Sequence, residues 1–192
     1  MTPVWGGVDV GDLRKGFHVV VIDAEGLVDG PTPVRSAAEA VRWLTRFEPI
    51  LTAVDSPISA APEGHRLREE ERRLKREVCG IRWTPDIGSL EANPGYYGWI
   101  FHGFELHHAL RDAGLGAVEC FPTASWTRWA GARGGTTRAR WTREALSTLG
   151  LAGLPSKTNQ DDRDAIAAAV TARMCSRGRI EHFGEIVVPL PS

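Results

Sequence analysis

Cysteine is scarce in this sequence: the three cysteines, Cys79, Cys120 and Cys175, lie far apart and form no C-x-x-C pair. An odd number of scattered cysteines indicates neither a zinc site nor a disulfide framework. Apolar runs of about 18 residues are missing, so we expect no segment that crosses a membrane. The start of the chain lacks a basic region followed by an apolar run, so we expect no signal peptide and a cytoplasmic protein.

A surplus of charge of either sign is absent too, because the formal net charge is −1 at pH 7. A protein without a global basic field can contact nucleic acid only through a local patch. Hydrophobic residues make up 42% of the chain and charged residues 24%, which is ordinary for a globular protein. The 192 residues suit a single domain, 1–192, with a helical insertion that we place at residues 58–115.

Short apolar segments between helical patterns predict an α/β fold with a mixed five-stranded sheet flanked by helices. Strands are expected at residues 4–10, 17–23, 27–34, 50–54 and 116–121, with a closing edge strand at 184–189. Short turns join the first three strands, which indicates an antiparallel meander. A helix at residues 36–48, opened by a capping box, precedes the fourth strand, so that strand should lie parallel to the first.

Two of these strands end on an aspartate, Asp9 in the first strand and Asp55 after the fourth. The carboxyl ends of parallel strands meet at one edge of an open α/β sheet, where such folds usually bind ligands. We therefore expect both carboxylates in one site. The alternative is that each aspartate only begins a turn, a position where aspartate is common.

The last long helix, expected to run to about Arg177, begins with an acidic cluster that includes Asp161 and Asp164. These two aspartates share a helix face with small residues, and such a face lets a helix lie close on a sheet. The helix would then carry both carboxylates to the strand ends. Acids in a first turn also interact favourably with the helix dipole, which alone could explain the cluster. A second face, Ile166, Val170 and Met174, is apolar and is available to the insertion or to a homodimer partner.

Glu119 lies inside the fifth strand, where an acid is costly unless it is paired or holds a metal. It is therefore either a site residue or the partner of an arginine such as Arg66. Residues 120–143 contain no acid but several arginines and tryptophans. Arginines with exposed aromatics suit a nucleic-acid contact, whereas the alternative is a surface loop whose tryptophans pack inward. The nucleic-acid-binding candidates are Arg66, Arg128, Arg133, Arg138, Arg140 and Trp129.

The expected site thus combines Asp9, Asp55, Asp161 and Asp164, with Glu119 as a fifth catalytic candidate. Carboxylates so close together repel one another, and divalent cations remove that repulsion. Oxygen ligands without histidine or cysteine select Mg²⁺ or Mn²⁺. Two such ions clamp the attacking and leaving oxygens of a phosphoryl displacement. The sequence therefore predicts a two-metal nuclease that acts on DNA or RNA.

The motifs resemble known families at this point. Gly7-Val8-Asp9, Val54-Asp55 and Asp161-x-x-Asp164-Ala165 resemble the metal-binding carboxylates of RuvC-type Holliday-junction resolvases, although Asp55 stands where the resolvases place a glutamate. The chain as a whole is similar to domain-of-unknown-function family 429, described as predicted ribonuclease H-like nucleases. The matching pieces are GVDVG (7–11), VDSP (54–57), the Arg66 segment, NPGYYGW (93–99), VECFPTASW (118–126), NQDDRDAIAAAVTA (159–172) and IVVP (186–189). The resemblance implies a ribonuclease H-like fold and a metal-dependent nuclease.

Two other classes of function remain open. Actin-like ATPases and sugar kinases share this fold, and Asp9-Val10-Gly11 resembles their first phosphate loop. The chain lacks their second Asp-x-Gly loop after the fourth strand, which makes an ATP-dependent phosphotransferase the weaker alternative. The other alternative is a non-catalytic module on the same fold that binds metal or nucleic acid without turnover.

Overall fold

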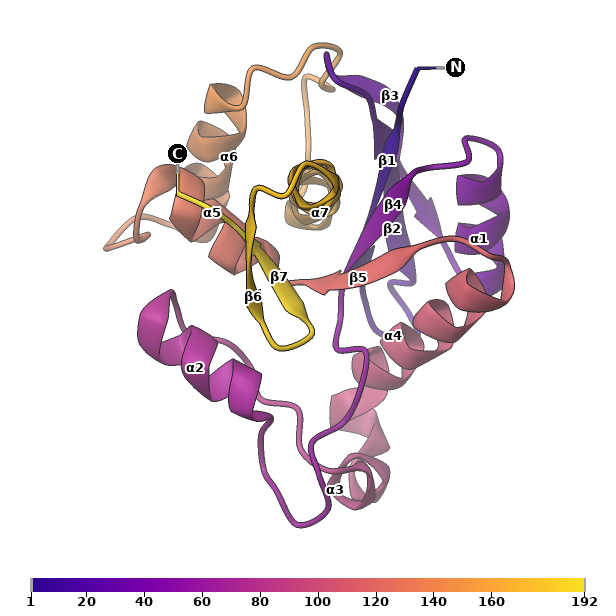
Figure 1. The fold of residues 1–192 in the computed structure, drawn as a ribbon, viewed down its shortest axis with the longest axis vertical. Coiled ribbons are helices and arrows are strands. Elements are labelled where there is room, and N and C mark those ends of the chain that lie inside the picture. The colour runs from indigo at the N-terminus through magenta and orange to yellow at the C-terminus, as the bar shows by residue number, and fades with distance from the viewer. Residues whose placement is uncertain (1, 192) are drawn as a thin grey trace.

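The computed structural model describes residues 2–191 and shows one mixed sheet with helices on both faces (Figure 1). The strands are β1 (Trp5–Val10), β2 (Phe17–Ile22), β3 (Leu27–Val34), β4 (Leu51–Asp55), β5 (Ala117–Cys120), β6 (Ile180–Phe183) and β7 (Ile186–Pro189). The helices are α1 (Ala37–Thr45), α2 (Glu69–Glu77), α3 (Ile87–Ala92), α4 (Pro94–Asp112), α5 (Pro122–Ala130), α6 (Arg138–Thr148) and α7 (Gln160–Ser176). The α/β class is confirmed, but the sheet has seven strands rather than five.

The strand order is β3-β2-β1-β4-β5-β7-β6. β1 pairs antiparallel with β2 and parallel with β4, as the meander and the crossover through α1 predict. The prediction that the closing segment is an edge strand is wrong, because β7 pairs with both β5 and β6. The short strand β6 turns back through Gly184 and becomes the edge instead.

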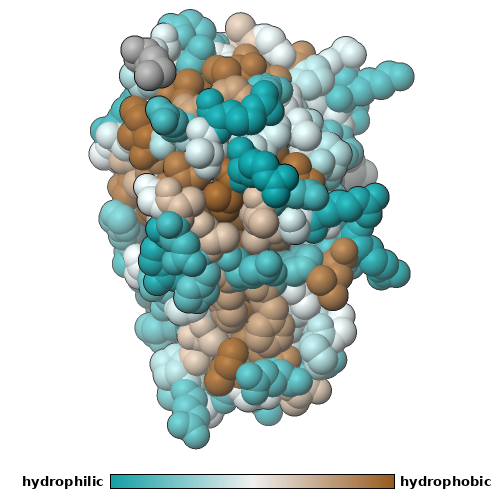
Figure 2. All heavy atoms as spheres, turned by 90° about the vertical axis from the view of Figure 1, so that its right-hand side faces the viewer, coloured by the Kyte–Doolittle hydropathy of each residue, from teal (hydrophilic) through white to brown (hydrophobic). Residues whose placement is uncertain are grey.

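Helices cover the two faces of the sheet with separate cores. On one face α7 packs with α5 and α6, and Trp126, Trp141 and Ile166 are buried there. On the other face α1 and α4 bury Leu44 and Leu106 against β1 and β2. The outer surface over α1 and α4 mixes hydrophilic and hydrophobic residues (Figure 2). Among residues 2–191, no helix combines the length and the apolar character needed to cross a membrane.

The contact between α7 and β1 is unusually close. A Cβ atom added at Gly7 would lie 2.2 Å from the carbonyl oxygen of Ala165 and 2.3 Å from the amide nitrogen of Ala169. The alanines of α7 are fully buried on this face. The predicted small-residue face therefore lies directly on the central strand, which sets the position of the first turn of α7.

The segment at residues 58–115 contains α2, α3 and α4 and adds no strand to the sheet. Its two ends pack differently: Leu110 in α4 belongs to the core beside α1, whereas Leu74 in α2 packs on Phe183 at the sheet edge. The segment thus forms a wall that starts and ends on the sheet.

Two expectations about surface segments need correction. The tryptophans of residues 120–143 do not face solvent, because Trp126 and Trp141 are buried and Trp129 packs on them from α5. The apolar stripe assigned to the insertion or to a dimer partner lies in the chain's own core, where Ile166 is 0% and Val170 3% exposed. The sequence basis for a homodimer is therefore lost.

Replacing Gly7 by alanine should destabilise the packing of α7 on β1. The new methyl group meets helix backbone rather than a flexible side chain, so we expect Gly7→Ala to cost at least about 2 kcal/mol of unfolding free energy. Thermal melts should show a loss of about 4–8 °C. The matched control is Gly88→Ala, where a Cβ has open space and helical backbone. Equal melting temperatures for the two variants would contradict the close contact.

Candidate active site

The structure brings the four predicted aspartates to the floor of one cleft. Asp9 and Asp55 are direct neighbours in the parallel register of β1 and β4. The first turn of α7 supplies Asp161 and Asp164. These residues and Glu119 all line a cleft of about 880 Å³. The cleft is bounded by the 58–115 segment on one side and by the starts of α5 and α6 on the other.

Burial and like charge dominate the electrostatics of the first pair. Burial first, and then the charges of Asp55, Asp164 and Asp161, raise the pKa of Asp9 well above its usual value. Burial and the charge of Asp164 raise the pKa of Asp55 to about 8, while Arg138 opposes that rise. Both shifts have the same physical origin, because burial and repulsion between neighbouring carboxylates both disfavour the ionised form. The pair of Asp9 and Asp55 therefore favours binding of a cation, either a proton or a metal ion.

Basic and polar side chains hold the second pair. Lys15, from the turn after β1, reaches Asp161 with its Nζ atom 3.0 Å from Oδ2. Arg138, the first residue of α6, donates to Asp164 at 2.8 Å. The indole of Trp126 donates to the other oxygen of Asp164 at 2.9 Å, and Gln160 donates to both oxygens. Asp164 is thereby 3% exposed and fixed in orientation.

Glu119 is paired rather than free. Both of its oxygens accept from the guanidinium of Arg68, and Oε2 also accepts from the backbone N–H of Ile58 at 2.9 Å. Burial raises the pKa of Glu119, and the Arg68 charge offsets part of that rise. Arg68 also contacts Glu71, which accepts from the backbone of Thr84. The alternative of an arginine partner is the arrangement found, but the arginine is Arg68 and not the exposed Arg66.

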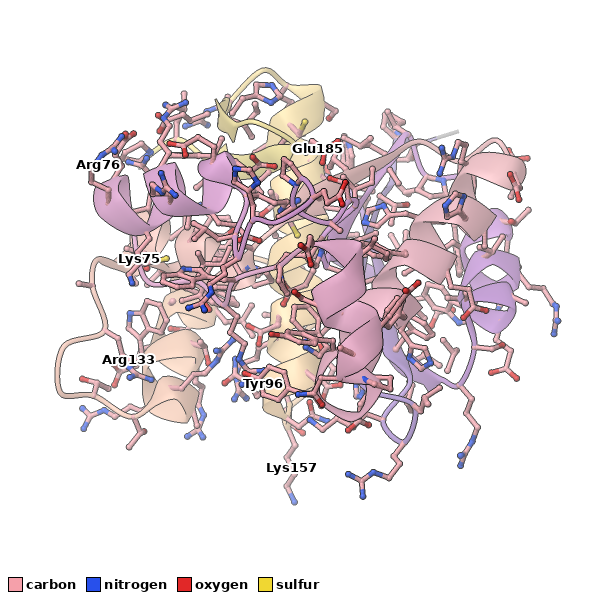
Figure 3. All side chains as sticks on the ribbon, turned by 90° about the horizontal axis from the view of Figure 1, so that it is seen from below. Lys75, Arg76, Tyr96, Arg133, Lys157 and Glu185 are labelled. Atoms are coloured by element: carbon pink, nitrogen blue, oxygen red, sulfur yellow. The ribbon has the colours of Figure 1, made fainter. Side chains whose placement is uncertain are left out.

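The predicted nucleic-acid-binding residues do not form one patch. Arg138 lines the cleft, whereas Arg66, Arg133 and Arg140 are exposed elsewhere. Arg140 pairs with Glu144 one helical turn away. Arg128 pairs with Glu181 of β6 at 2.6 Å, and Trp129 is half-buried beside Trp126. Figure 3 shows Arg133 on the loop before α6, at the outer margin of the molecule.

The donor set suits a hard divalent cation, although the acids are not arranged as a finished cage. In the described range 2–191, no three potential ligands stand close enough to form a metal-holding group. The cleft instead holds seven carboxylates and four basic side chains. Oxygen ligands with surplus negative charge are what Mg²⁺ and Mn²⁺ bind. The residues present therefore fit such ions in their chemistry.

Sequence reasoning missed three contributors to this floor: Lys15, Arg68 and Gln160. Gln160 lies four residues before Asp164, a helical spacing that could have pointed to their contact. Lys15 carried no signal beyond its place in the turn after Asp9. Arg68 lies in a run of charged residues in which it is the only buried basic residue, and the sequence does not distinguish it from its neighbours.

Two solved structures of Thermus thermophilus RuvC are similar to this chain. The first, of RuvC, is 20% identical with a TM-score of 0.52, and the match covers 91% of this chain and 96% of RuvC. The second, RuvC in complex with a Holliday junction substrate, is 17% identical with a TM-score of 0.55 and covers 92% and 96%. The chain has the ribonuclease H-like fold of RuvC. No family model and no curated protein matches it.

Because the pKa of Asp55 is raised in the folded state, the free energy of unfolding of this protein should depend on pH. Between the unfolded value of about 4 and the folded value of about 8, the folded state binds more protons, so stability falls as pH rises. Melts of metal-free protein should lose stability from pH 5 to pH 8. Asp55→Asn should flatten this slope and raise the melting temperature at pH 8 by about 2–6 °C. The exposed control Glu91→Gln should keep the wild-type slope, and an unchanged slope in Asp55→Asn would contradict the cause given.

Removing Glu119 should act on stability, unlike removing Asp9. Arg68 is 2% exposed, and Glu119→Ala leaves its charge partly unpaired in the core. We expect a loss of about 3–5 kcal/mol, measured by chemical denaturation. Asp9→Asn removes a repulsion and should not destabilise. If both variants were as stable as the wild type, Glu119 would not serve as the partner that Arg68 needs.

Proposed function

We propose that this protein is a metal-dependent nuclease that hydrolyses phosphodiester bonds of DNA or RNA at the four-aspartate cleft. One observation carries the proposal: Asp9 and Asp55 adjoin at the ends of parallel strands, with Asp164 close enough to raise the pKa of both. Such buried repulsion is costly to a fold, and it is typical of sites that work with a cation. The ribonuclease H-like fold supports the same class of activity.

Asp9, Asp55, Asp161 and Asp164 would hold two Mg²⁺ or Mn²⁺ ions. When bound, such ions supply Lewis acidity at a phosphate and lower the pKa of a water molecule. Lys15 and Arg138 now neutralise Asp161 and Asp164. If metal ions neutralised these carboxylates instead, Lys15 and Arg138 would be free to bind phosphate oxygens. Arginine binds such oxygens in a bidentate way.

Glu119 enters the proposal as a positioning residue rather than as a ligand. Its oxygens are occupied by Arg68 and the backbone of Ile58. Through Arg68 it fixes the start of α2, and with it one wall of the cleft. Asp55 would act from β4, at the position where the resolvases place a glutamate, and the parallel register makes it a direct neighbour of Asp9.

Nucleic acid is the partner that we propose, and RuvC itself has been seen with a Holliday junction substrate. A panel of labelled substrates that includes branched DNA tests whether this protein cleaves junctions. We also propose membership of domain-of-unknown-function family 429, supported by the motifs around Asp9, Asp55 and Asp164. The free state of Cys79, Cys120 and Cys175 suits the cytoplasm that the sequence predicts.

Asp9→Asn and Asp164→Asn should each lower cleavage of labelled nucleic acid by more than about a hundredfold, because loss of a metal ligand exceeds the usual effect of a supporting residue. Both variants should remain folded by circular dichroism. The matched control is Asp112→Asn, an exposed aspartate at the end of α4, which should cleave like the wild type. Wild-type activity in either cleft variant would overturn the site assignment.

Calorimetry with Mn²⁺ separates the nuclease from the non-catalytic module. We expect the wild type to bind Mn²⁺ and the double variant Asp9→Asn/Asp164→Asn to lose that binding. Metal binding without cleavage of DNA, RNA or branched substrates would favour the module. A wild type that binds Mn²⁺ neither alone nor with an uncleavable oligonucleotide would rule out the metal site.

A further inference from the structure

One wall of the cleft carries aromatic and basic groups that the metal chemistry does not use. The start of α4 contributes Tyr96 and Trp99, and the loop before α3 contributes Arg82. Figure 3 shows Tyr96 at the start of α4 on the side toward α6. Arg138 of α6 lines the same cleft from across. The cleft therefore contains aromatic and basic side chains in addition to its carboxylates.

Tyr96 is displayed rather than packed. Its side chain is among the large hydrophobic ones that remain exposed, at 62%. The rings of Tyr96 and Tyr97 form a T-shaped pair, with centroids 4.8 Å apart and an angle of 87° between the planes, so Tyr97 can cover no more than one face of the Tyr96 ring. A large aromatic held at a cleft wall in this way loses little freedom when it stacks on a ligand.

The backbone next to Tyr96 is bare as well. Gly95 and Gly98 both line the cleft, and a Cβ atom added at either would meet nothing within 4 Å. Gly80, which also lines the cleft, has the same open space. Beside Tyr96 the wall therefore has no side chain at Gly95 or Gly98, which leaves room for a planar group close to the helix.

The cleft combines carboxylates with an exposed basic residue. Asp9 and Asp55 lie at the ends of β1 and β4 and Asp164 lies in the first turn of α7, whereas Arg82 lines the same cleft from the loop before α3 and is exposed. A ligand that fits both regions presents phosphate to the metal-loaded floor and a planar ring to the wall. Nucleotides combine these two features, and a base stacked on an aromatic ring is held without sequence preference.

Pairing decides which nucleic acid can use this wall. In a duplex the bases are stacked on one another and face inward, so a ring beside the backbone has no base to contact. An unpaired strand can turn its bases outward onto aromatic side chains. We infer that the cleft binds an unpaired strand, with the base beside the reacting phosphate stacked on Tyr96. This inference rests on the proposed nuclease function for the reaction, but not for the binding.

The test measures binding and cleavage separately. Fluorescence anisotropy would follow a short labelled oligonucleotide with an uncleavable backbone, as a single strand and as the same strand in a blunt duplex, in DNA and RNA forms. The wild type should bind the single strand more tightly in at least one form. Tyr96→Ala should weaken that binding by roughly 5–150-fold. Tyr96→Phe, which keeps the ring, should bind like the wild type.

The matched control is Ile87→Ala, which removes an exposed apolar side chain of α3 in the same segment, and it should leave binding unchanged. Equal binding of single strand and duplex, or no loss in Tyr96→Ala, would overturn the inference even if the protein cleaves DNA. Single-strand binding that depends on Tyr96 without any cleavage would uphold the inference while removing the proposed nuclease function. Binding of a free mononucleotide as tight as that of the strand would also overturn it.

Discussion

The repulsion between the buried carboxyl groups of Asp9 and Asp55 is the constraint on which the rest of this structure depends. Parallel pairing of β1 and β4 makes them neighbours, and no backbone adjustment can separate them without breaking the register. Burial and this repulsion raise the pKa of Asp9, and basic side chains contact the adjoining Asp161 and Asp164. The surrounding core must offset this unfavourable charge, which is the usual relation between a working site and the fold that carries it.

The packing of α7 on the sheet, rather than local charge, positions Asp161 and Asp164. Gly7 allows α7 to rest on β1, and the helix then has no freedom to tilt its first turn away from the strand ends. Trp126 contributes both to the core and to the site, because its ring is buried in the core while its N–H donates to Asp164 and orients it. The same atoms therefore hold the fold together and aim the carboxylate.

The sequence was informative wherever a pattern is local. Short, largely continuous apolar segments and the crossover at α1 predict the order around β1, and hence that Asp9 and Asp55 are neighbours. Partners distant in the chain left no such trace: Glu119 pairs with Arg68 rather than Arg66 because the start of α2 fixes which arginine turns inward. The arginines and tryptophans of residues 120–143 indicated only a surface contact, and α5 and α6 were not predicted there. The four-residue β6 was too short and too polar to stand out.

The shared floor of β1, β4 and α7 has a consequence for synthesis. Asp9 and Asp55 emerge from the ribosome early, whereas Asp161 and Asp164 belong to the last long helix, and chains are made and folded from the N-terminus onward. A nascent chain that has reached only β5 has half of the carboxylates and no α7 to cover β1. The complete acidic floor therefore forms only after most of the chain has been synthesised.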